Sequence, residues 1–176
     1  MVFTNQESKC VNIKKYCILE VKSIKDRNIK MNIRIATIND LPKILDLYKE
    51  LNPEEEQLNL ATAESIWKNS EAKNTVTYLI ALENNDVVGS CNIAFIDNLT
   101  RSGRPYGIIE NVITSANHRR KGIGKKLMEK AVEIAKEKNC YKVILLSSAK
   151  RTEAHKFYES IGFDGKSKKG FELRFL

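Results

Sequence analysis

Histidine, proline and closely paired cysteines are scarce in this 176-residue sequence. It contains two histidines, three prolines and four cysteines, and no two cysteines form a Cys-x-x-Cys pair. Structural zinc sites are usually assembled from closely spaced Cys and His residues, so no metal centre of that kind is expected. We expect the four cysteines to be reduced and structural; they are Cys10, Cys17, Cys91 and Cys140.

Long apolar runs are absent as well. No stretch approaches the ~20 apolar residues that a membrane-spanning helix needs, and the first residues lack the charged-then-apolar pattern of a signal peptide. The composition, 42% hydrophobic and 30% charged, is typical of a folded protein in water. We therefore expect a cytoplasmic protein without a membrane partner, long enough for one domain with a packed core.

The net charge of +8 is unevenly distributed along the chain. Residues 1–30 carry seven basic and three acidic residues, residues 31–114 seven and twelve, and residues 115–176 sixteen and seven. A basic final third suits a polyanionic ligand and an acidic middle suits a cationic one, although solubility alone explains such an imbalance equally well. No nucleic-acid recognition motif accompanies the charge, so nucleic acid is not an expected partner.

The apolar pattern predicts a single sheet with helices around it. The predicted elements are a strand at 32–37, a helix capped by Asn39 and stopped by Asn52-Pro53, a helix at 62–71, strands at 76–82 and 87–96 joined by a hairpin turn at 84–86, a strand at 107–114, a helix at 121–138, a strand at 142–147, a short helix containing Phe157, and a last strand at 170–175. Early hairpins make antiparallel neighbours, whereas a crossover helix joins parallel ones. The sequence thus predicts an α/β (α+β) fold, a single mixed, mostly antiparallel sheet flanked by helices.

Residues 1–30 precede this pattern and form an N-terminal extension. Residues 16–21 in it fit a short strand and part of a helix about equally.

A basic, glycine-containing turn joins strand 107–114 to the long helix after it. Glycines at 122 and 124 allow a close backbone approach to a phosphate, and the first N–H groups of a helix lack intrahelical acceptors. Cations at a helix N-terminus interact unfavourably with the helix dipole, which destabilises the helix unless an anion binds there. The five cations here are Arg119, Arg120, Lys121, Lys125 and Lys126. The turn predicts a phosphate site; the alternative is that the glycines only start a helix and the cations are solvated.

Two familiar phosphate loops do not fit this turn. A dinucleotide fingerprint requires a third glycine at position 127, which is Leu127. A Walker A loop requires glycine at 119 and Ser or Thr at 126, where Arg119 and Lys126 stand. A different kind of phosphate turn is indicated.

Two motifs stand in the stretch 109–163. Arg119, Gly122 and Gly124 form an Arg-x-x-Gly-x-Gly turn, and Ala154 is followed four residues on by Tyr158 and then by Gly162-Phe163. With these motifs the stretch resembles the GNAT superfamily of acyl-CoA-dependent N-acetyltransferases, whose turn is Gln/Arg-x-x-Gly-x-Gly/Ala and whose later signature is alanine, tyrosine four residues on and then Gly-Phe. The resemblance covers about residues 32–176 and implies that residues 31–176 are an N-acetyltransferase domain with a GNAT-like fold. Many members carry Asn where this chain has Arg151; an arginine can reach a phosphate instead.

The resemblance also implies where acetyl-CoA binds. The acyl donor is expected in a split between strands 107–114 and 142–147, with the backbone of Val112 and Ile113 pairing with the pantetheine arm. No metal is implied. The expected cofactor-binding residues are Val112, Ile113, Thr114, Arg119, Arg120, Lys121, Gly122, Ile123, Gly124, Lys125, Ser148, Arg151, Ala154 and Tyr158.

Transfer to an amine needs a proton acceptor, because an alkyl amine is almost entirely protonated at pH 7. Glu110 is the candidate base, since in a regular strand it shares a face with apolar Ile108 and Val112, where its pKa can rise. It acts directly, through a water, or only by holding a cationic substrate. Tyr158 is the candidate acid for the leaving sulfur. The structural alternatives are a carboxylate paired within the sheet and a tyrosine that only packs.

These observations predict an N-acetyltransferase that moves an acetyl group from acetyl-CoA to a primary amine by direct attack. The acceptor, a small molecule or a peptide amine, is not identified. The alternative from another class is a non-catalytic domain that binds or senses acyl-CoA. Sheet edges and the 1–30 extension offer routes to a homodimer.

Overall fold

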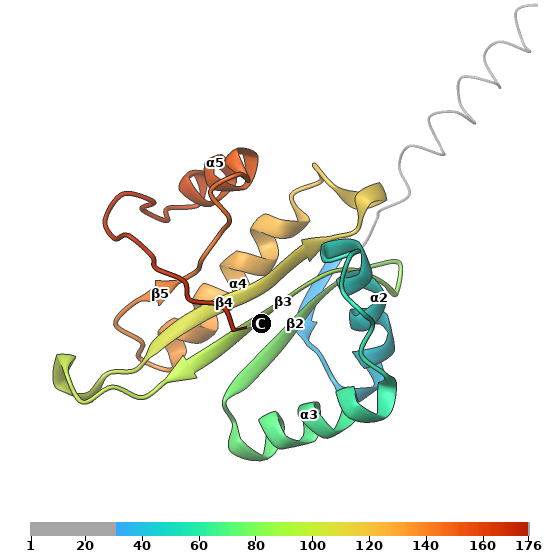
Figure 1. Cartoon of the computed structure of the whole chain (residues 1–176), viewed down its shortest axis with the longest axis horizontal. Coiled ribbons are helices and arrows are strands. Elements are labelled where there is room, and N and C mark those ends of the chain that lie inside the picture. Colours follow the sequence, from blue (N-terminus) through green and yellow to red (C-terminus); the bar gives the residue numbers. More distant parts are fainter. Residues whose placement is uncertain (1–30, 176) are drawn as a thin grey trace, which may run out of the picture. The chain divides into compact units, whose positions relative to one another are not determined.

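The computed structural model describes residues 31–175 and contains one five-stranded sheet with the strand order β1-β2-β3-β4-β5 (Figure 1). The first four strands pair antiparallel in this order: β1 (Met31–Ile35), β2 (Val76–Glu83), β3 (Asp86–Ile96) and β4 (Tyr106–Thr114). Strand β5 (Val143–Ile144) is parallel to β4. The predicted mixed, mostly antiparallel sheet is confirmed. The expectations for residues 1–30 lie outside the described residues.

In residues 31–175, four α-helices flank this sheet. They are α2 (Leu41–Leu51), α3 (Leu60–Lys73), α4 (Ile123–Glu137) and α5 (Thr152–Ser160), with 3₁₀ turns η1 (Ile38–Asp40), η2 (Arg101–Gly103) and η3 (Ala116–His118). Helix α4 is the crossover that makes β4 and β5 parallel, as predicted. No helix in residues 31–175 is long and apolar enough to cross a membrane.

Each face of the sheet has its own apolar core, because side chains alternate along β2. Leu79 and Ala81 lie in the core beneath α4, whereas Ile80 lies in the core beneath α2 and α3. The first core includes the fully buried Leu127 and Met128 of α4, and the second includes Trp67 of α3, which is 5% exposed. Burying side chains of this size stabilises the fold by about 1.5–3 kcal/mol each.

The entry into α2 differs from the prediction. A 3₁₀ turn precedes the helix, and Asp40 rather than Asn39 organises its start. The Asp40 carboxylate accepts a hydrogen bond from the Thr37 backbone N–H at 2.8 Å and two from the Arg34 guanidinium at 2.7 and 2.8 Å. The bonds from Arg34 are the main cause that lowers the pKa of Asp40 to about 2. This ion pair links β1 to α2.

Asparagines set two other boundaries. Asn84 and Asn85 have φ angles of 53° and 72°, the left-handed values that a tight hairpin between β2 and β3 requires, which confirms the predicted turn. The side chain of Asn59 accepts a hydrogen bond from the Thr62 N–H at 2.9 Å and caps α3, so this helix begins before the predicted residue 62.

Two predicted strands are wrong or shortened. The strand expected at 142–147 is reduced to Val143–Ile144, and the last strand expected at 170–175 is absent. Residues 170–175 have no sheet partner in the described part of the chain. The prediction failed because a period-two pattern indicates which side chains could share a face but not which strand lies beside them.

Candidate functional site

Strand β4 carries a β-bulge at its centre. Asn92 of β3 pairs with Glu110 and Ser90 pairs with Ile113, so a single β3 residue, Cys91, lies opposite both Asn111 and Val112. Asn111 has the left-handed φ of 53° that accommodates the extra residue. The regular strand assumed for Glu110 is therefore wrong, and the bulge changes the direction of the backbone next to this carboxylate.

A cleft opens where β4 and β5 separate. The two strands pair at Gly107 with Val143 and at Ile108 with Ile144, and then part. The chain beyond β5 turns away from the sheet and leaves a cavity of about 700 Å³. The lining residues are Leu51, Asn52, Ile109, Glu110, Asn111, Val112, Leu145, Leu146, Ser147, Ser148, Ala149, Arg151, Tyr158, Gly170, Phe171, Glu172 and Arg174. The early end of β5 is thus what creates this site.

Glu110 lies on the β4 wall of the cleft. Desolvation raises the pKa of this carboxyl above its ordinary value, although the side chain keeps access to solvent. A carboxylate with a raised pKa at the mouth of a cavity is a suitable proton acceptor.

Tyr158 lies on another wall of the cleft and comes from α5. Its ring contacts Phe157, with centroids 5.2 Å apart, and Phe163, at 6.3 Å. Burial is the main cause that raises the pKa of Tyr158, and the nearby charge of Glu110 adds to it, whereas Arg151 opposes it. The phenol therefore keeps its proton at neutral pH and can donate it into the cleft.

The turn before α4 has the geometry expected of an anion site. Gly122 is the residue before the helix and has a left-handed φ of 77°. The Lys126 N–H donates to the Gly122 carbonyl at 3.2 Å, so helical geometry leaves the N–H groups of residues 123–125 without intrahelical acceptors. Gly124 brings this turn against α5, since a Cβ there would lie 3.4 Å from Cζ of Phe157.

Three of the five cations of this turn have protein partners; one of them is Lys125, whose Nζ lies 3.9 Å from Oε1 of Glu129. The Arg119 Nε donates to the Thr114 carbonyl at 3.2 Å. Lys121 lies 3.4 Å from a carboxylate oxygen of Glu83, which is 9% exposed and also lies 3.2 Å from Nε2 of His118. Arg119 and Lys121 thus help to hold the turn, although sequence reasoning placed both against phosphate.

The structure collects part of the predicted site in the cleft. Glu110, Val112, Ser148, Arg151 and Tyr158 line it. The side chains of Ile113 and Ile123 are buried in the core, so only their backbone atoms can contact a ligand. Thr114, Ala154 and the turn residues Arg119, Arg120, Lys121, Gly122, Gly124 and Lys125 lie outside the cleft lining.

Three features near the site were missed by sequence reasoning. The C-terminal end of α2 contributes Leu51 and Asn52 to the cleft, and the segment 170–174 closes another side. Glu50 accepts hydrogen bonds from the Ala116 N–H at 2.9 Å and the Ser115 hydroxyl at 3.2 Å, which ties α2 to the end of β4. The contacts of Glu50 join residues more than sixty positions apart in the sequence. No local sequence pattern predicts contacts of this kind.

Ser148 and His155 form a further contact that the sequence did not indicate. Nε2 of His155 lies 3.0 Å from the Ser148 carbonyl oxygen, and the Arg151 N–H donates to the same oxygen at 2.9 Å. His155 thus helps to anchor the loop that carries Ser148 and Arg151 into the cleft.

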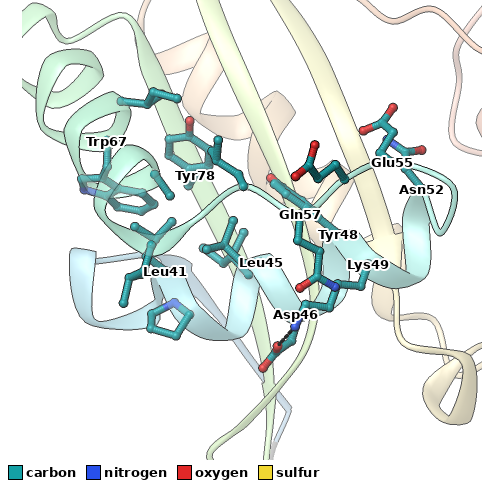
Figure 2. A pocket seen from close by; sticks show the side chains of 17 residues that line it. Leu41, Leu45, Asp46, Tyr48, Lys49, Asn52, Glu55, Gln57, Trp67 and Tyr78 are labelled. Atoms are coloured by element: carbon teal, nitrogen blue, oxygen red, sulfur yellow. Dashed lines mark hydrogen bonds and ion pairs between the residues drawn. The ribbon is translucent and has the colours of Figure 1, made fainter.

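A second cavity of about 360 Å³ lies between α2 and α3 (Figure 2). Its apolar wall includes Leu41, Leu45 and the stacked rings of Trp67 and Tyr78, whose centroids are 4.5 Å apart. Asn52 borders both cavities, but no predicted catalytic or cofactor residue lines this one. The cleft between β4 and β5 is therefore the candidate active site.

Comparison with known proteins agrees with this geometry. The family described as "Acetyltransferase (GNAT) family" matches residues 41–163, which include the bulged strand, the glycine turn and α5. A putative acetyltransferase from Agrobacterium tumefaciens str. C58 is 38% identical in sequence, with a TM-score of 0.77 over 82% of this chain and 99% of that one. A predicted acetyltransferase from Clostridium acetobutylicum, solved with acetyl-CoA, is 27% identical, with a TM-score of 0.68 over 82% of this chain and 96% of that one.

Among curated proteins, the chain is similar to the glucosamine 6-phosphate N-acetyltransferase of Trypanosoma brucei brucei. The two are 43% identical over 77 residues, which is 44% of this chain and half the length of the relative. The family match spans well over half of the chain and contains the turn and the cleft-lining residues from Leu51 to Tyr158. This chain therefore belongs to the GNAT family of acetyltransferases.

Proposed function

We propose that this protein transfers the acetyl group of acetyl-CoA to a primary amine by direct attack in the cleft between β4 and β5. The observation that carries the proposal is that Glu110 and Tyr158 line one cavity and that desolvation raises the pKa of both. A base and an acid with these properties meet the two proton transfers that aminolysis of a thioester requires.

The residues present fit acetyl-CoA. The free edge of β4 beyond its pairing with β5 supports backbone contacts from Val112 and Ile113 to an extended pantetheine arm. The open N–H groups of residues 123–125, together with Arg120 and Lys125, suit the phosphates. Arg151 and Ser148, at the other wall, are further polar contacts. When bound, acetyl-CoA supplies the activated acetyl group.

Glu110 and Tyr158 divide the proton transfers. The Glu110 carboxylate accepts a proton from the acceptor's ammonium group, directly or through a water, and so releases the nitrogen lone pair. The nitrogen forms a bond to the acetyl carbon and loses its second proton to solvent, while the carbon–sulfur bond breaks. The Tyr158 hydroxyl donates its proton to the departing sulfur and later recovers one from solvent.

Glucosamine 6-phosphate is the acceptor that we propose to test first. The Trypanosoma relative is named for this substrate. Glucosamine 6-phosphate carries a cationic amine and an anionic phosphate, so its binding site needs an acidic group for the amine and a basic group for the phosphate. The cleft offers the carboxylate of Glu110 to an ammonium group and the guanidinium group of Arg151 to a phosphate. These two side chains support an acceptor that carries both groups.

An acceptor panel tests this proposal. The protein is incubated with acetyl-CoA and glucosamine 6-phosphate, glucosamine, polyamines or peptides with free amino groups, and the release of CoA thiol is followed. We expect turnover with glucosamine 6-phosphate and a much lower kcat/KM with glucosamine. Equal rates with the two sugars would refute the phosphate contact. Tight CoA binding without turnover on any amine would instead favour an acyl-CoA-binding domain.

Substitution of Gly122 by aspartate is expected to weaken CoA binding at least tenfold. A carboxylate at this position would stand beside the phosphates, and like charges repel strongly at a site that water only partly screens. Isothermal titration calorimetry with CoA measures the effect.

Gly103→Asp is a matched control for this substitution. Gly103 has a φ of 72°, close to the 77° of Gly122, and a Cβ at either residue meets no described heavy atom within 4 Å. Both variants therefore carry the same backbone strain and the same added charge, but Gly103 lies before β4 and not at the turn. Equal CoA affinity in the two variants would rule out the phosphate assignment of the turn.

A further inference from the structure

Two carboxylates from distant parts of the chain contact the segment that connects β4 to α4. This connecting segment, residues 115–121, contains η3 and leads directly into Gly122, the residue before the helix. Glu50 comes from the C-terminal end of α2, and Glu83 is the last residue of β2. Both lie outside the lining of the cleft between β4 and β5. Their contacts therefore concern the glycine turn and not the walls of the cleft.

Glu50 holds the start of the connecting segment. One of its carboxylate oxygens accepts a hydrogen bond from the Ala116 backbone N–H at 2.9 Å, and the other accepts one from the Ser115 hydroxyl at 3.2 Å. Ala116 is the first residue of η3, and the first N–H groups of a helical turn have no acceptor within that turn. Glu50 supplies this acceptor as an N-cap side chain does, but from sixty-six positions away.

Glu83 holds the end of the same segment. Its Oε2 lies 3.2 Å from Nε2 of His118 and 3.4 Å from Nζ of Lys121. The side chain of Glu83 is only 10% exposed, whereas that of Lys121 is 43% exposed. A carboxylate that is this buried needs partners close by, because its removal from water destabilises the charge. Lys121 immediately precedes Gly122, so the contact ends next to the glycine turn.

The two carboxylates come from opposite faces of the sheet. Glu83 continues the alternation of Leu79 and Ala81, which lie in the core beneath α4. Glu50 belongs to α2, which covers the other face. Between their contacts and the helix, Arg120 has a left-handed φ of 64°. A residue other than glycine keeps such a backbone conformation only where its surroundings fix it, and the two carboxylates provide that restraint.

We propose that Glu50 and Glu83 are positioning residues that fix the connecting segment and so preorganise the backbone N–H groups of residues 123–125 for the phosphates of acetyl-CoA. This inference rests on the proposed function, since it takes the glycine turn as the phosphate site. A turn that already has its binding conformation loses less conformational entropy when the ligand binds, which increases affinity. The two carboxylates act through the connecting segment and do not contact the ligand.

The direction of the effect separates this role from a simple effect of charge. A carboxylate near an anion site repels the phosphates, so by charge alone its removal should tighten CoA binding. Removal of Glu83 would also free Lys121 to pair with a phosphate. The positioning role requires the opposite result, because a loosened turn has to be ordered again each time CoA binds.

Isothermal titration calorimetry with CoA tests each carboxylate separately. Glu83→Leu replaces the buried carboxylate by an apolar side chain of similar size, and Glu50→Ala, at an exposed residue, removes both hydrogen bonds with little risk to the fold. We expect each variant to bind CoA roughly ten- to a hundredfold more weakly than the unmodified chain. Unchanged or tighter binding in either variant would overturn the role of that carboxylate.

Asp46→Ala is the matched control for Glu50→Ala. Asp46 is an exposed carboxylate one helical turn earlier on α2, and it pairs with Lys49 at 3.0 Å and not with the connecting segment. The variant removes the same charge from the same helix, so it should bind CoA with unchanged affinity. An equal loss of affinity in Asp46→Ala would mean that the charge of α2, and not the contact of Glu50, controls CoA binding.

Hydrogen exchange in the free protein measures the preorganisation without any ligand. The amides of residues 115–125 should exchange faster in Glu50→Ala and Glu83→Leu than in the unmodified chain, whereas amides in the middle of α4 should keep their rates. Weaker CoA binding without faster exchange at residues 115–125 would contradict the preorganisation of the turn.

An acyl donor without phosphates separates the turn from the rest of the site. S-acetyl-pantetheine carries the thioester but no phosphate, so kcat/KM with this donor should change by less than about twofold in Glu50→Ala, while kcat/KM with acetyl-CoA falls. Equal losses with both donors would refute a role confined to the turn. If the unmodified chain does not bind CoA at all, the proposed function fails, and hydrogen exchange still decides whether Glu50 and Glu83 fix the connecting segment.

Discussion

Tyr158→Phe is expected to lower kcat roughly ten- to a thousandfold with little change in CoA affinity. The substitution removes one hydroxyl and keeps the ring that packs on Phe157 and Phe163, so the fold should survive. Burial raises the pKa of this phenol and keeps it protonated at neutral pH, which is the state that a proton donor needs. Without the donor, the sulfur must leave as an unprotonated thiolate.

Steady-state kinetics with saturating acetyl-CoA measure this effect, and calorimetry with CoA reports binding separately. Tyr106→Phe is the control, because Tyr106 stands at the far end of β4, against Tyr141, with ring centroids 6.1 Å apart. It should retain the full rate. An unchanged kcat in Tyr158→Phe would remove this residue from the mechanism and leave it a packing role.

Glu110→Gln is expected to reduce kcat/KM by roughly 10²- to 10⁴-fold near neutral pH. Glutamine occupies the same volume but cannot accept a proton. For the unmodified enzyme, the rate should fall as pH falls through the pKa of Glu110, because the protonated acid is not a base. Desolvation raises that pKa, so the fall should centre above the ordinary glutamate value of about 4.3.

A pH profile of both proteins tests this role. Ionisation of the acceptor amine affects the two profiles equally, so the limb that belongs to Glu110 is the one that disappears in Glu110→Gln. Glu64→Gln is the control, because Glu64 lies on α3 and forms an exposed ion pair with Lys68. This variant should leave the pH profile unchanged. A raised KM with an unaltered kcat and an unaltered limb would mean that Glu110 only holds the cationic acceptor.

Sequence patterns identified the elements that depend on local chemistry. The Asn84–Asn85 hairpin is an example, because asparagine tolerates the left-handed backbone that the turn imposes. The amphipathic pattern of α4 is another, since Leu127, Ala131 and Ile134 recur on one face and are buried together. These features need no knowledge of distant neighbours, and their approximate bounds followed from a few adjacent residues.

Errors arose where a distant partner decides the structure. The expected strand at 170–175 has the right alternation but no neighbour in residues 31–175, and the strand at 142–147 ends after two residues. The bulge at Asn111 is set by pairing with β3, which the sequence of β4 does not reveal. Lys121 was expected to face phosphate, yet it lies beside Glu83, thirty-eight positions away.

The sequence alone determined that residues 107–163 contain a strand, a glycine turn, a helix and a later tyrosine, because spacing and residue type govern each of these locally. Only the tertiary structure decided that Glu110 and Tyr158 border the same cavity. That outcome depends on how far β5 stays paired with β4, on the bulge, and on where α5 returns to the sheet. Each is a packing result between segments distant in sequence, in which small differences in free energy among alternative contacts select one arrangement.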